Sequence, residues 1–106
     1  MDISLVTGGA GFIGSHIVRS LLARGDRVKV LDNFSTGKWE NLAAIKDDVE
    51  IIDADIREPS KVARAVQDVD YIFHHAAFVS VPQSVEEPDT CFDINVQGTL
   101  NVLEAA

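Results

Sequence analysis

Three glycines near the start of the chain have the spacing of turns that bind the pyrophosphate of a nucleotide. They can be counted as Gly8-x-x-Gly11-x-x-Gly14 or as Gly9-x-Gly11-x-x-Gly14. Gly8 or Gly9 would allow a tight turn with positive backbone φ. Gly11 would let phosphates approach the main chain, and Gly14 would let the following helix lie close to the preceding strand. Because a helix N-terminus offers N–H donors and the positive end of its dipole, we expect a pyrophosphate here.

A carboxylate follows these glycines at the distance expected of a ribose-binding residue. Asp32 ends the apolar run Val28–Leu31, about 20 residues beyond the glycines. It is placed to accept hydrogen bonds from both hydroxyls of an adenosine ribose, and it would repel a 2′-phosphate. The pattern therefore favours NAD over NADP as the cofactor. The alternative is that Asp32 is only a turn residue at the end of a strand.

Alternating strands and helices must position these residues. Apolar runs predict four strands, at Ile3–Val6, Val28–Leu31, Val49–Asp53 and Tyr71–His74. Helical spacing predicts a helix over 13–22 that stops at Gly25, a short helix over 39–45, and a helix that begins with Pro59. A last helix begins near Asp89 and places four apolar side chains on one face: Phe92, Val96, Leu100 and Leu103.

This order of elements predicts a single domain of the α/β class. Residues 1–106 would form a Rossmann-type parallel sheet of four strands, in the order 3-2-1-4, with helices on both faces. A ligand is expected at the carboxyl ends of the first and fourth strands, where the strand order reverses.

Other residues at this edge of the sheet could contact a cofactor. Asp55 could accept a hydrogen bond from the adenine amino group, and the aliphatic chain of Ile56 could cover the ring. The alternative for both residues is a turn that leads into a helix. Ala76 and Ala77 are small enough to let a dinucleotide pass over the end of the fourth strand.

Four further polar or aromatic residues can be interpreted from their positions. Adjacent side chains of a strand point to opposite faces, so we do not expect His74 and His75 to share a metal ion. Asn95 lies beside an apolar helical face and either ties the helix to the loop after the fourth strand or reaches the cofactor. Tyr71 is the only tyrosine, and we interpret it as a core residue.

Composition excludes several kinds of protein. The chain has 106 residues, of which 46% are hydrophobic, and its formal net charge is −8. We therefore expect neither nucleic acid nor an anionic membrane as a partner. Cys91 is the only cysteine, which excludes an internal disulfide. No signal peptide or membrane-spanning run is recognisable, so we expect a cytoplasmic protein.

Five segments resemble those of the extended short-chain dehydrogenase/reductases, and more narrowly their NAD-dependent nucleotide-sugar epimerases and dehydratases. They follow in the same order along the chain: Thr7–His16, Leu31–Gly37, Asp55–Arg57, His74–Ala77 and Asn95–Ala106. Residues 80–84, followed by Glu87 and Pro88, resemble UDP-sugar 4-epimerases, especially those that act on N-acetylhexosamine sugars. The resemblance thus implies a role in reversing the configuration at C4 of a UDP-hexose.

The resemblance also implies which residues contact NAD and the sugar nucleotide. Ser80 matches a position that contacts the sugar nucleotide. The cofactor would be bound by the backbone amides of Phe12 and Ile13 and by Asp32, Asn33, Phe34, Ser35, Thr36, Gly37, Asp55, Ile56, His75, Ala76, Ala77, Phe78 and Asn95.

The catalytic tyrosine of this family belongs to a Tyr-x-x-x-Lys motif, which these 106 residues do not contain. We therefore expect the amino-terminal portion of an epimerase, without its catalytic segment and sugar-binding domain and inactive by itself. Two alternatives remain: a part of a nucleotide-sugar dehydratase or decarboxylase, or a module that binds NAD or self-associates without catalysis. Self-association would use the exposed edge of the fourth strand or the last helix.

Overall fold

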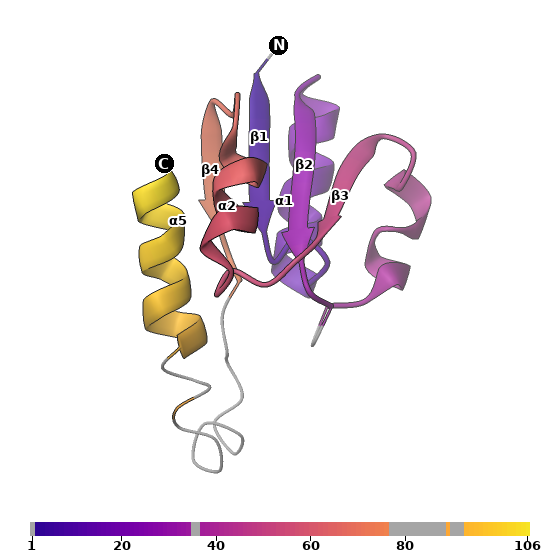
Figure 1. Ribbon diagram of the computed structural model, residues 1–106. Coiled ribbons are helices and arrows are strands. Elements are labelled where there is room, and N and C mark those ends of the chain that lie inside the picture. The colour runs from indigo at the N-terminus through magenta and orange to yellow at the C-terminus, as the bar shows by residue number, and fades with distance from the viewer. Residues whose placement is uncertain (1, 35–36, 77–88, 90–92) are drawn as a thin grey trace.

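The computed structural model describes residues 2–34, 37–76, 89 and 93–106. Its main elements are, in chain order, β1 (Ile3–Thr7), α1 (Phe12–Ala23), β2 (Arg27–Asp32), β3 (Val49–Asp53), α2 (Pro59–Val66), β4 (Tyr71–His74) and α5 (Thr99–Ala105) (Figure 1). All three strand pairs are parallel, and the strand order is β3-β2-β1-β4. The predicted α/β class and strand order are confirmed.

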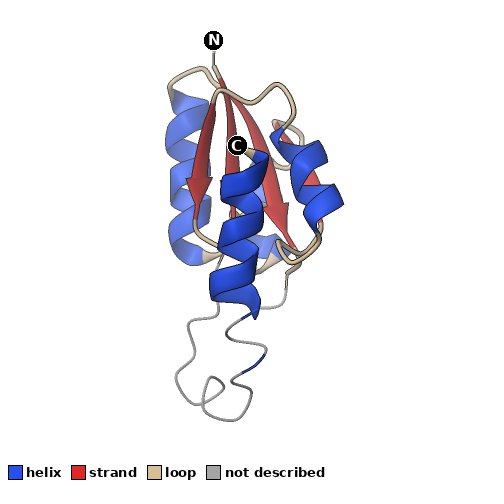
Figure 2. Cartoon of the chain, turned by 60° about the vertical axis from the view of Figure 1, so that its left-hand side comes forward, coloured by secondary structure: helices blue, strands red, loops and turns tan. Residues whose placement is uncertain are grey.

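Helices cover both faces of this sheet (Figure 2). Successive side chains of a strand point to opposite faces, so neighbouring residues enter different cores. Leu5 and Leu31 pack with α2 and α5, whereas Val6 and Val30 pack with α1. All four are buried, as expected for the central strands of a parallel sheet that is covered on both sides.

The connection between β2 and β3 differs from the predicted short helix. Residues 39–45 form two short 3-10 turns, Trp39–Asn41 and Ala43–Ile45. Between them lies Leu42, which is completely buried in the core on the α1 side. One anchoring side chain suffices for such short turns, and no amphipathic face of helical length is formed.

The last helix packs through a different face from the apolar one that the sequence suggests. A π-helical turn, Asp93–Gly98, precedes α5. Val96, Leu100 and Leu103 are exposed, and Phe92 lies outside the described residues. The buried residues of α5 are instead Asn101 and Val102.

The glycine before α5 explains this choice of face. A Cβ atom at Gly98 would lie 2.5 Å from Cδ1 of Ile56. The helix can therefore approach the loop after β3 closely only where it has no side chain. This contact turns Asn101 and Val102 inward.

Tyr71 is not a core residue, contrary to the prediction. Its side chain is 54% exposed. It begins β4, which among the described strands pairs only with β1 and therefore forms an edge. Within the described parts of the chain, no helix has the length and apolar character needed to cross a membrane.

Candidate functional site

The glycine turn joins β1 to α1 at the carboxyl edge of the sheet. Gly8 has a φ of +70°, and its N–H donates to the carbonyl of Leu31 at 2.8 Å. A Cβ atom at Gly14 would lie 2.1 Å from the carbonyl oxygen of Gly8. The tight turn is thus at Gly8 rather than Gly9. Gly14 permits close packing of the helix as predicted, but the helix packs there against the glycine turn and not against the strand.

The first turn of α1 leaves main-chain donors at this edge. Its first hydrogen bond runs from Ser15 N–H to the carbonyl of Gly11 at 2.9 Å. Among the described residues, no acceptor is bound to the N–H groups of Phe12, Ile13 and Gly14. Within the described part of the chain, a Cβ atom at Gly11 would approach one atom, the carbonyl oxygen of Gly8, at 3.3 Å. The turn therefore offers an open approach to helix N–H donors, which fits a pyrophosphate.

Asp32 lies directly beside the glycine turn, at the end of β2. Its side chain is only 8% exposed. Oδ2 accepts a hydrogen bond from the Ala10 N–H at 3.0 Å, and Oδ1 accepts one from the Phe34 N–H at 2.7 Å. Each carboxylate oxygen can accept two hydrogen bonds, and the described residues supply one N–H to each through these two contacts. Each oxygen thus has a second acceptor position that fits a ribose hydroxyl.

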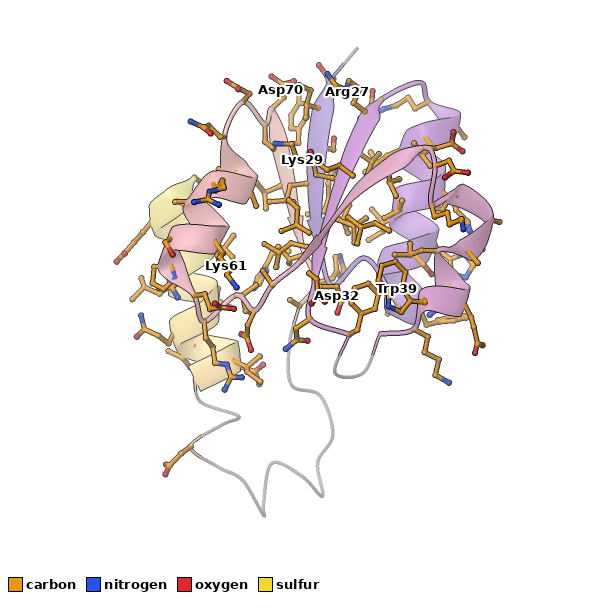
Figure 3. The ribbon with its side chains drawn as sticks, turned by 45° about the vertical axis from the view of Figure 1, so that its right-hand side comes forward. Arg27, Lys29, Asp32, Trp39, Lys61 and Asp70 are labelled. Atoms are coloured by element: carbon orange, nitrogen blue, oxygen red, sulfur yellow. The ribbon has the colours of Figure 1, made fainter. Side chains whose placement is uncertain are left out.

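The loop after Asp32 folds back over the glycine turn. The Lys38 N–H and the Asn41 amide both donate to the carbonyl of Ala10, at 3.0 and 2.7 Å. The rings of Phe34 and Trp39 stack with their centroids 4.3 Å apart. Figure 3 shows Trp39 at the same end of the sheet as Asp32. Trp39 was not among the predicted site residues, although an aromatic residue next to the expected adenosine loop was a usable signal.

Asp55 follows β3 and is held by a set of donors. Its carboxylate accepts hydrogen bonds from the backbone N–H and the guanidinium of Arg57 and, at 3.2 Å, from the amide of Asn33. The hydrogen bonds from the Arg57 guanidinium hold the pKa of Asp55 below its ordinary value of 3.8. Asp55 thus remains an ionised acceptor near Asn33, which follows Asp32.

Ile56 does not present its side chain at this edge as predicted. It is only 3% exposed and belongs to the core formed by α2 and α5. The Asn101 amide donates to its carbonyl at 3.0 Å. The aliphatic chain therefore anchors the last helix, and it does not form an exposed cover for a bound base.

A chain of hydrogen bonds links the end of β4 to the last helix. The Thr99 hydroxyl donates to the Asn95 carbonyl at 2.7 Å, so it accepts from Nε2 of His74 at 2.9 Å. Nδ1 of His74 is then the acceptor for the hydroxyl of Thr7, at 2.6 Å. Burial, and secondarily the neighbouring His75, lower the pKa of His74 below 6.5, which agrees with a neutral ring.

Thr7, which was not among the predicted site residues, also orients the main chain after β4. Its completely buried hydroxyl oxygen accepts the N–H groups of His75 and Ala76, at 2.9 and 3.1 Å. The imidazole of His75 itself is exposed. Within the described ranges, no group of three or more His, Cys, Asp or Glu side chains is arranged to hold a metal ion.

The two asparagines of the last helix have different positions. Asn95 is partly buried, and its main-chain carbonyl accepts the Thr99 hydroxyl, which also bonds His74 of β4. The predicted role of its side-chain amide stays a prediction. Asn101 is the buried one and bonds the loop after β3. Five predicted site residues lie outside the described parts of the chain: Ser35, Thr36, Ala77, Phe78 and Ser80.

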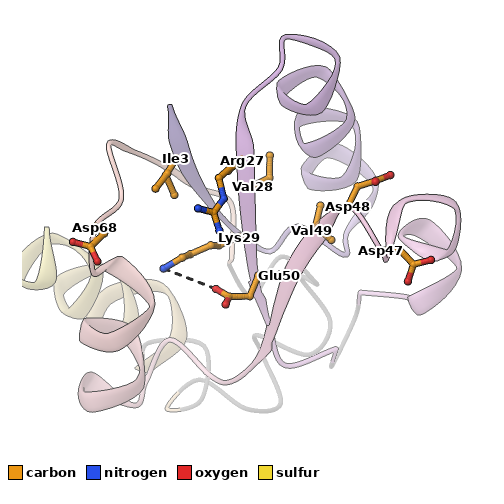
Figure 4. A pocket seen from close by; sticks show the side chains of 9 residues that line it. All are labelled: Ile3, Arg27, Val28, Lys29, Asp47, Asp48, Val49, Glu50 and Asp68. Atoms are coloured by element: carbon orange, nitrogen blue, oxygen red, sulfur yellow. Dashed lines mark ion pairs between the residues drawn. The ribbon is translucent and has the colours of Figure 1, made fainter. Parts of the chain in front are cut away.

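A pocket of 410 Å³ lies at the opposite end of the sheet, away from these residues (Figure 4). Both cations and carboxylates line it, among them Arg27, Asp48 and Asp68. Lys29 donates to the carbonyl of Gln67 at 3.1 Å, after the end of α2, and lies 3.9 Å from Glu50. Its polar contacts support α2, and none of the predicted site residues borders this pocket.

Comparison with known proteins shows which chains share this arrangement. The family described as GDP-mannose 4,6 dehydratase matches residues 5–106. The structure of the Thermus thermophilus UDP-glucose 4-epimerase in complex with NAD superimposes with a TM-score of 0.88 and 50% identity, covering 97% of this chain and 33% of that one. The dTDP-glucose 4,6-dehydratase DesIV of Streptomyces venezuelae, with NAD bound, superimposes with a TM-score of 0.91 and 41% identity, covering 98% and 35%.

A curated relative has a third activity. UDP-glucuronic acid decarboxylase 1 of Arabidopsis thaliana is 43% identical over 104 residues, which cover 96% of this chain and 23% of the relative. The chain spans about a third of the length of the first relatives that it matches, 32% and 33% in two of them. These relatives thus share the described fold but differ in what they do to a nucleotide sugar.

Proposed function

This chain belongs to the GDP-mannose 4,6 dehydratase family, and we propose that it binds NAD as the cofactor-binding part of a nucleotide-sugar 4-epimerase. This agrees with the resemblance to nucleotide-sugar epimerases and dehydratases that the sequence motifs carry. UDP-hexose is the proposed substrate of the whole protein. Ser80 is a proposed contact of that substrate.

The observation that carries the proposal is the pairing of the glycine turn with Asp32. Three helix N–H groups without an acceptor among the described residues lie where Gly11 leaves the approach open. Asp32 lies on the neighbouring strand and bonds the same turn through Ala10. A diphosphate and the hydroxyls of an attached ribose are the ligand groups that such donors and acceptors would bind together.

NAD, when bound, would supply the acceptor for the hydride of a sugar C4–H bond and the donor that returns it. The residues of this chain would then bind and orient the cofactor. The turn would hold the pyrophosphate, Asp32 and the loop after it the adenosine ribose, and Asp55 the adenine. The residues that Thr7 orients, His75 and Ala76, would border the path of the cofactor past β4.

Epimerase is the proposed activity because residues 80–84 resemble those of UDP-sugar 4-epimerases. A dehydratase or decarboxylase remains the second candidate, since relatives with both activities match the chain over nearly its whole length. NAD binding is common to both candidates. Product analysis of the whole protein with a UDP-hexose distinguishes a changed C4 configuration from loss of water or of carbon dioxide.

Calorimetric titration with NAD and NADP, for the original chain and for Asp32→Asn, tests the cofactor proposal. We expect saturable NAD binding that weakens by about tenfold in the variant, because an amide loses one acceptor and the charge. We also expect the preference for NAD over NADP to fall, because the carboxylate no longer repels a 2′-phosphate. Asparagine is chosen over alanine because its amide oxygen can keep one of the two main-chain N–H bonds that Asp32 accepts.

Asp53→Asn is the matched control. Asp53 is the residue of β3 that pairs in register with Asp32, but its side chain is exposed. This variant should bind NAD as the original chain does. If the original chain melts cooperatively but binds no NAD, the proposal that this part binds the cofactor is wrong.

A further inference from the structure

Asp55 is surrounded by donors from two loops. Oδ1 accepts the Arg57 N–H at 2.9 Å and Nε at 3.0 Å. Oδ2 accepts Nη2 of Arg57 at 2.6 Å and shares the Arg57 Nε–H at 3.0 Å. From the loop after β2, it also accepts Nδ2 of Asn33 at 3.2 Å. The carboxylate therefore joins the ends of β2 and β3.

Arg57 and Asn33 occupy different numbers of the hydrogen-bond acceptor positions of the Asp55 carboxylate. A carboxylate has about four acceptor positions, and three donor groups of Arg57 use three of them, with Nε–H shared between the two oxygens. The fourth is occupied by Asn33, whose contact at 3.2 Å is the longest of the set. The amide of Asn33 is a neutral, planar NH₂ group, as is the 6-amino group of adenine. The Asn33 position thus marks where an adenine amino group can bond without displacing Arg57.

We propose that Arg57 is a positioning residue that sets the base selectivity of the cofactor site, by holding Asp55 as an oriented acceptor for a 6-amino purine. The inference rests on the proposed NAD binding. In this arrangement the adenine amino group replaces the Asn33 amide at Oδ2. A 6-keto purine presents an oxygen to the same carboxylate and is rejected.

The main chain on both sides of Asp55 is held by hydrogen bonds. Arg57 therefore has to fix only the orientation of the Asp55 side chain. Ile56 is buried, and its carbonyl accepts the Asn101 amide. The Asp55 N–H donates to the carboxylate of Glu58 at 3.2 Å, and Glu58 in turn pairs with Lys61 at 3.0 Å. The orientation of the Asp55 side chain is then set by Arg57, through a two-point contact that a guanidinium can make and a lysine cannot.

The charge of Asp55 supports the same role. The Arg57 guanidinium keeps the pKa of the carboxyl below its ordinary value, so Asp55 is ionised at neutral pH and acts only as an acceptor. Hydrogen bonds to a charged group are stronger than those between neutral groups. Discrimination between amino and keto purines should therefore be measurable at a single contact.

The test compares NAD with nicotinamide hypoxanthine dinucleotide, whose base carries a 6-keto group and an N1–H in place of the 6-amino group and the unprotonated N1 of adenine. By calorimetric titration, the original chain should prefer NAD by at least about tenfold. Arg57→Gln should reduce this preference to less than about threefold, mainly through weaker NAD binding, and Arg57→Lys should restore part of it. A thermal melt verifies that each variant is folded.

Arg64→Gln is the control, because it makes the same substitution at an exposed arginine near the end of α2. Its NAD preference should be unchanged. If folded Arg57→Gln keeps the full preference or increases it, the inference is overturned while the proposed NAD binding stands. If the folded original chain binds neither dinucleotide, both the proposed function and this inference are wrong.

Discussion

The two halves of the candidate site are held together by different kinds of contact. In the half that β1, α1 and β2 form, main-chain groups make most of the contacts. In the half at the ends of β3 and β4, side chains make most of them. In the first half, Asp32 bonds two backbone N–H groups, and Gly14 lies against the Gly8 carbonyl. In the second half, Asp55 bonds the Arg57 and Asn33 side chains.

The two halves should therefore be destabilised by different kinds of substitution. Main-chain contacts depend on how closely two backbones approach, so they should respond to added atoms more than to changed polarity. Side-chain contacts depend on matched donors and acceptors, so they should respond to lost polar groups and to pH. The following predictions test this contrast.

The largest effect is expected for Gly14→Ala. Its methyl group would lie 2.1 Å from the Gly8 carbonyl oxygen, so the helix must move away from the turn. We expect the free energy of unfolding to fall by about 3 kcal/mol, as measured by urea denaturation. Gly11→Ala is the matched control, because among the residues that the structure describes its methyl group would approach one atom, at 3.3 Å. It should lose only about 1 kcal/mol but bind NAD less well. Equal losses of stability in both variants would contradict the steric explanation.

Asn101→Ala tests the half that side chains hold. The variant leaves the buried carbonyl of Ile56 without its amide donor, and we expect a loss of about 2 kcal/mol in urea denaturation. Glu104→Ala, on the exposed side of the same helix, should change stability by less than about 0.5 kcal/mol. A loss in Asn101→Ala no greater than in the control would show that this hydrogen bond does not hold the helix.

The smallest effect is expected from the titration of His74. Burial lowers its pKa below 6.5 in the folded chain, so the folded state binds fewer protons than the unfolded state. The stabilisation by the neutral ring is therefore complete above pH 6.5 and is lost as the pH falls through the folded pKa. Protonation would also place a donor against the Thr7 hydroxyl.

Melting temperatures between about pH 5 and 8, the range in which histidine titrates, measure this effect. The original chain should lose more stability on acidification than His74→Gln does. His16→Gln, which changes an exposed histidine of α1, should retain the original pH dependence. If His74→Gln loses as much stability as the original chain, another group is responsible.

The contrast between the two halves also explains which parts of the site the sequence predicts. The spacing of Gly8, Gly11 and Gly14 and the acidic end of a strand are local patterns, and the structure places them together as expected. The links from His74 to Thr99 and from Asn101 to Ile56 join residues 25 and 45 positions apart. No periodicity in the sequence marks such pairs.

Local patterns determine the strands, α1 and α2 and their order along the chain. Apolar runs, a glycine turn and Pro59 each favour one conformation in the residues next to them. Tertiary structure alone decides which side of the last helix is buried, since the close approach at Gly98 outweighs the apolar face that contains Leu100. It also decides that Tyr71 is exposed, because β4 is an edge among the described strands. Burial depends on what packs against a residue, and only the folded chain contains that information.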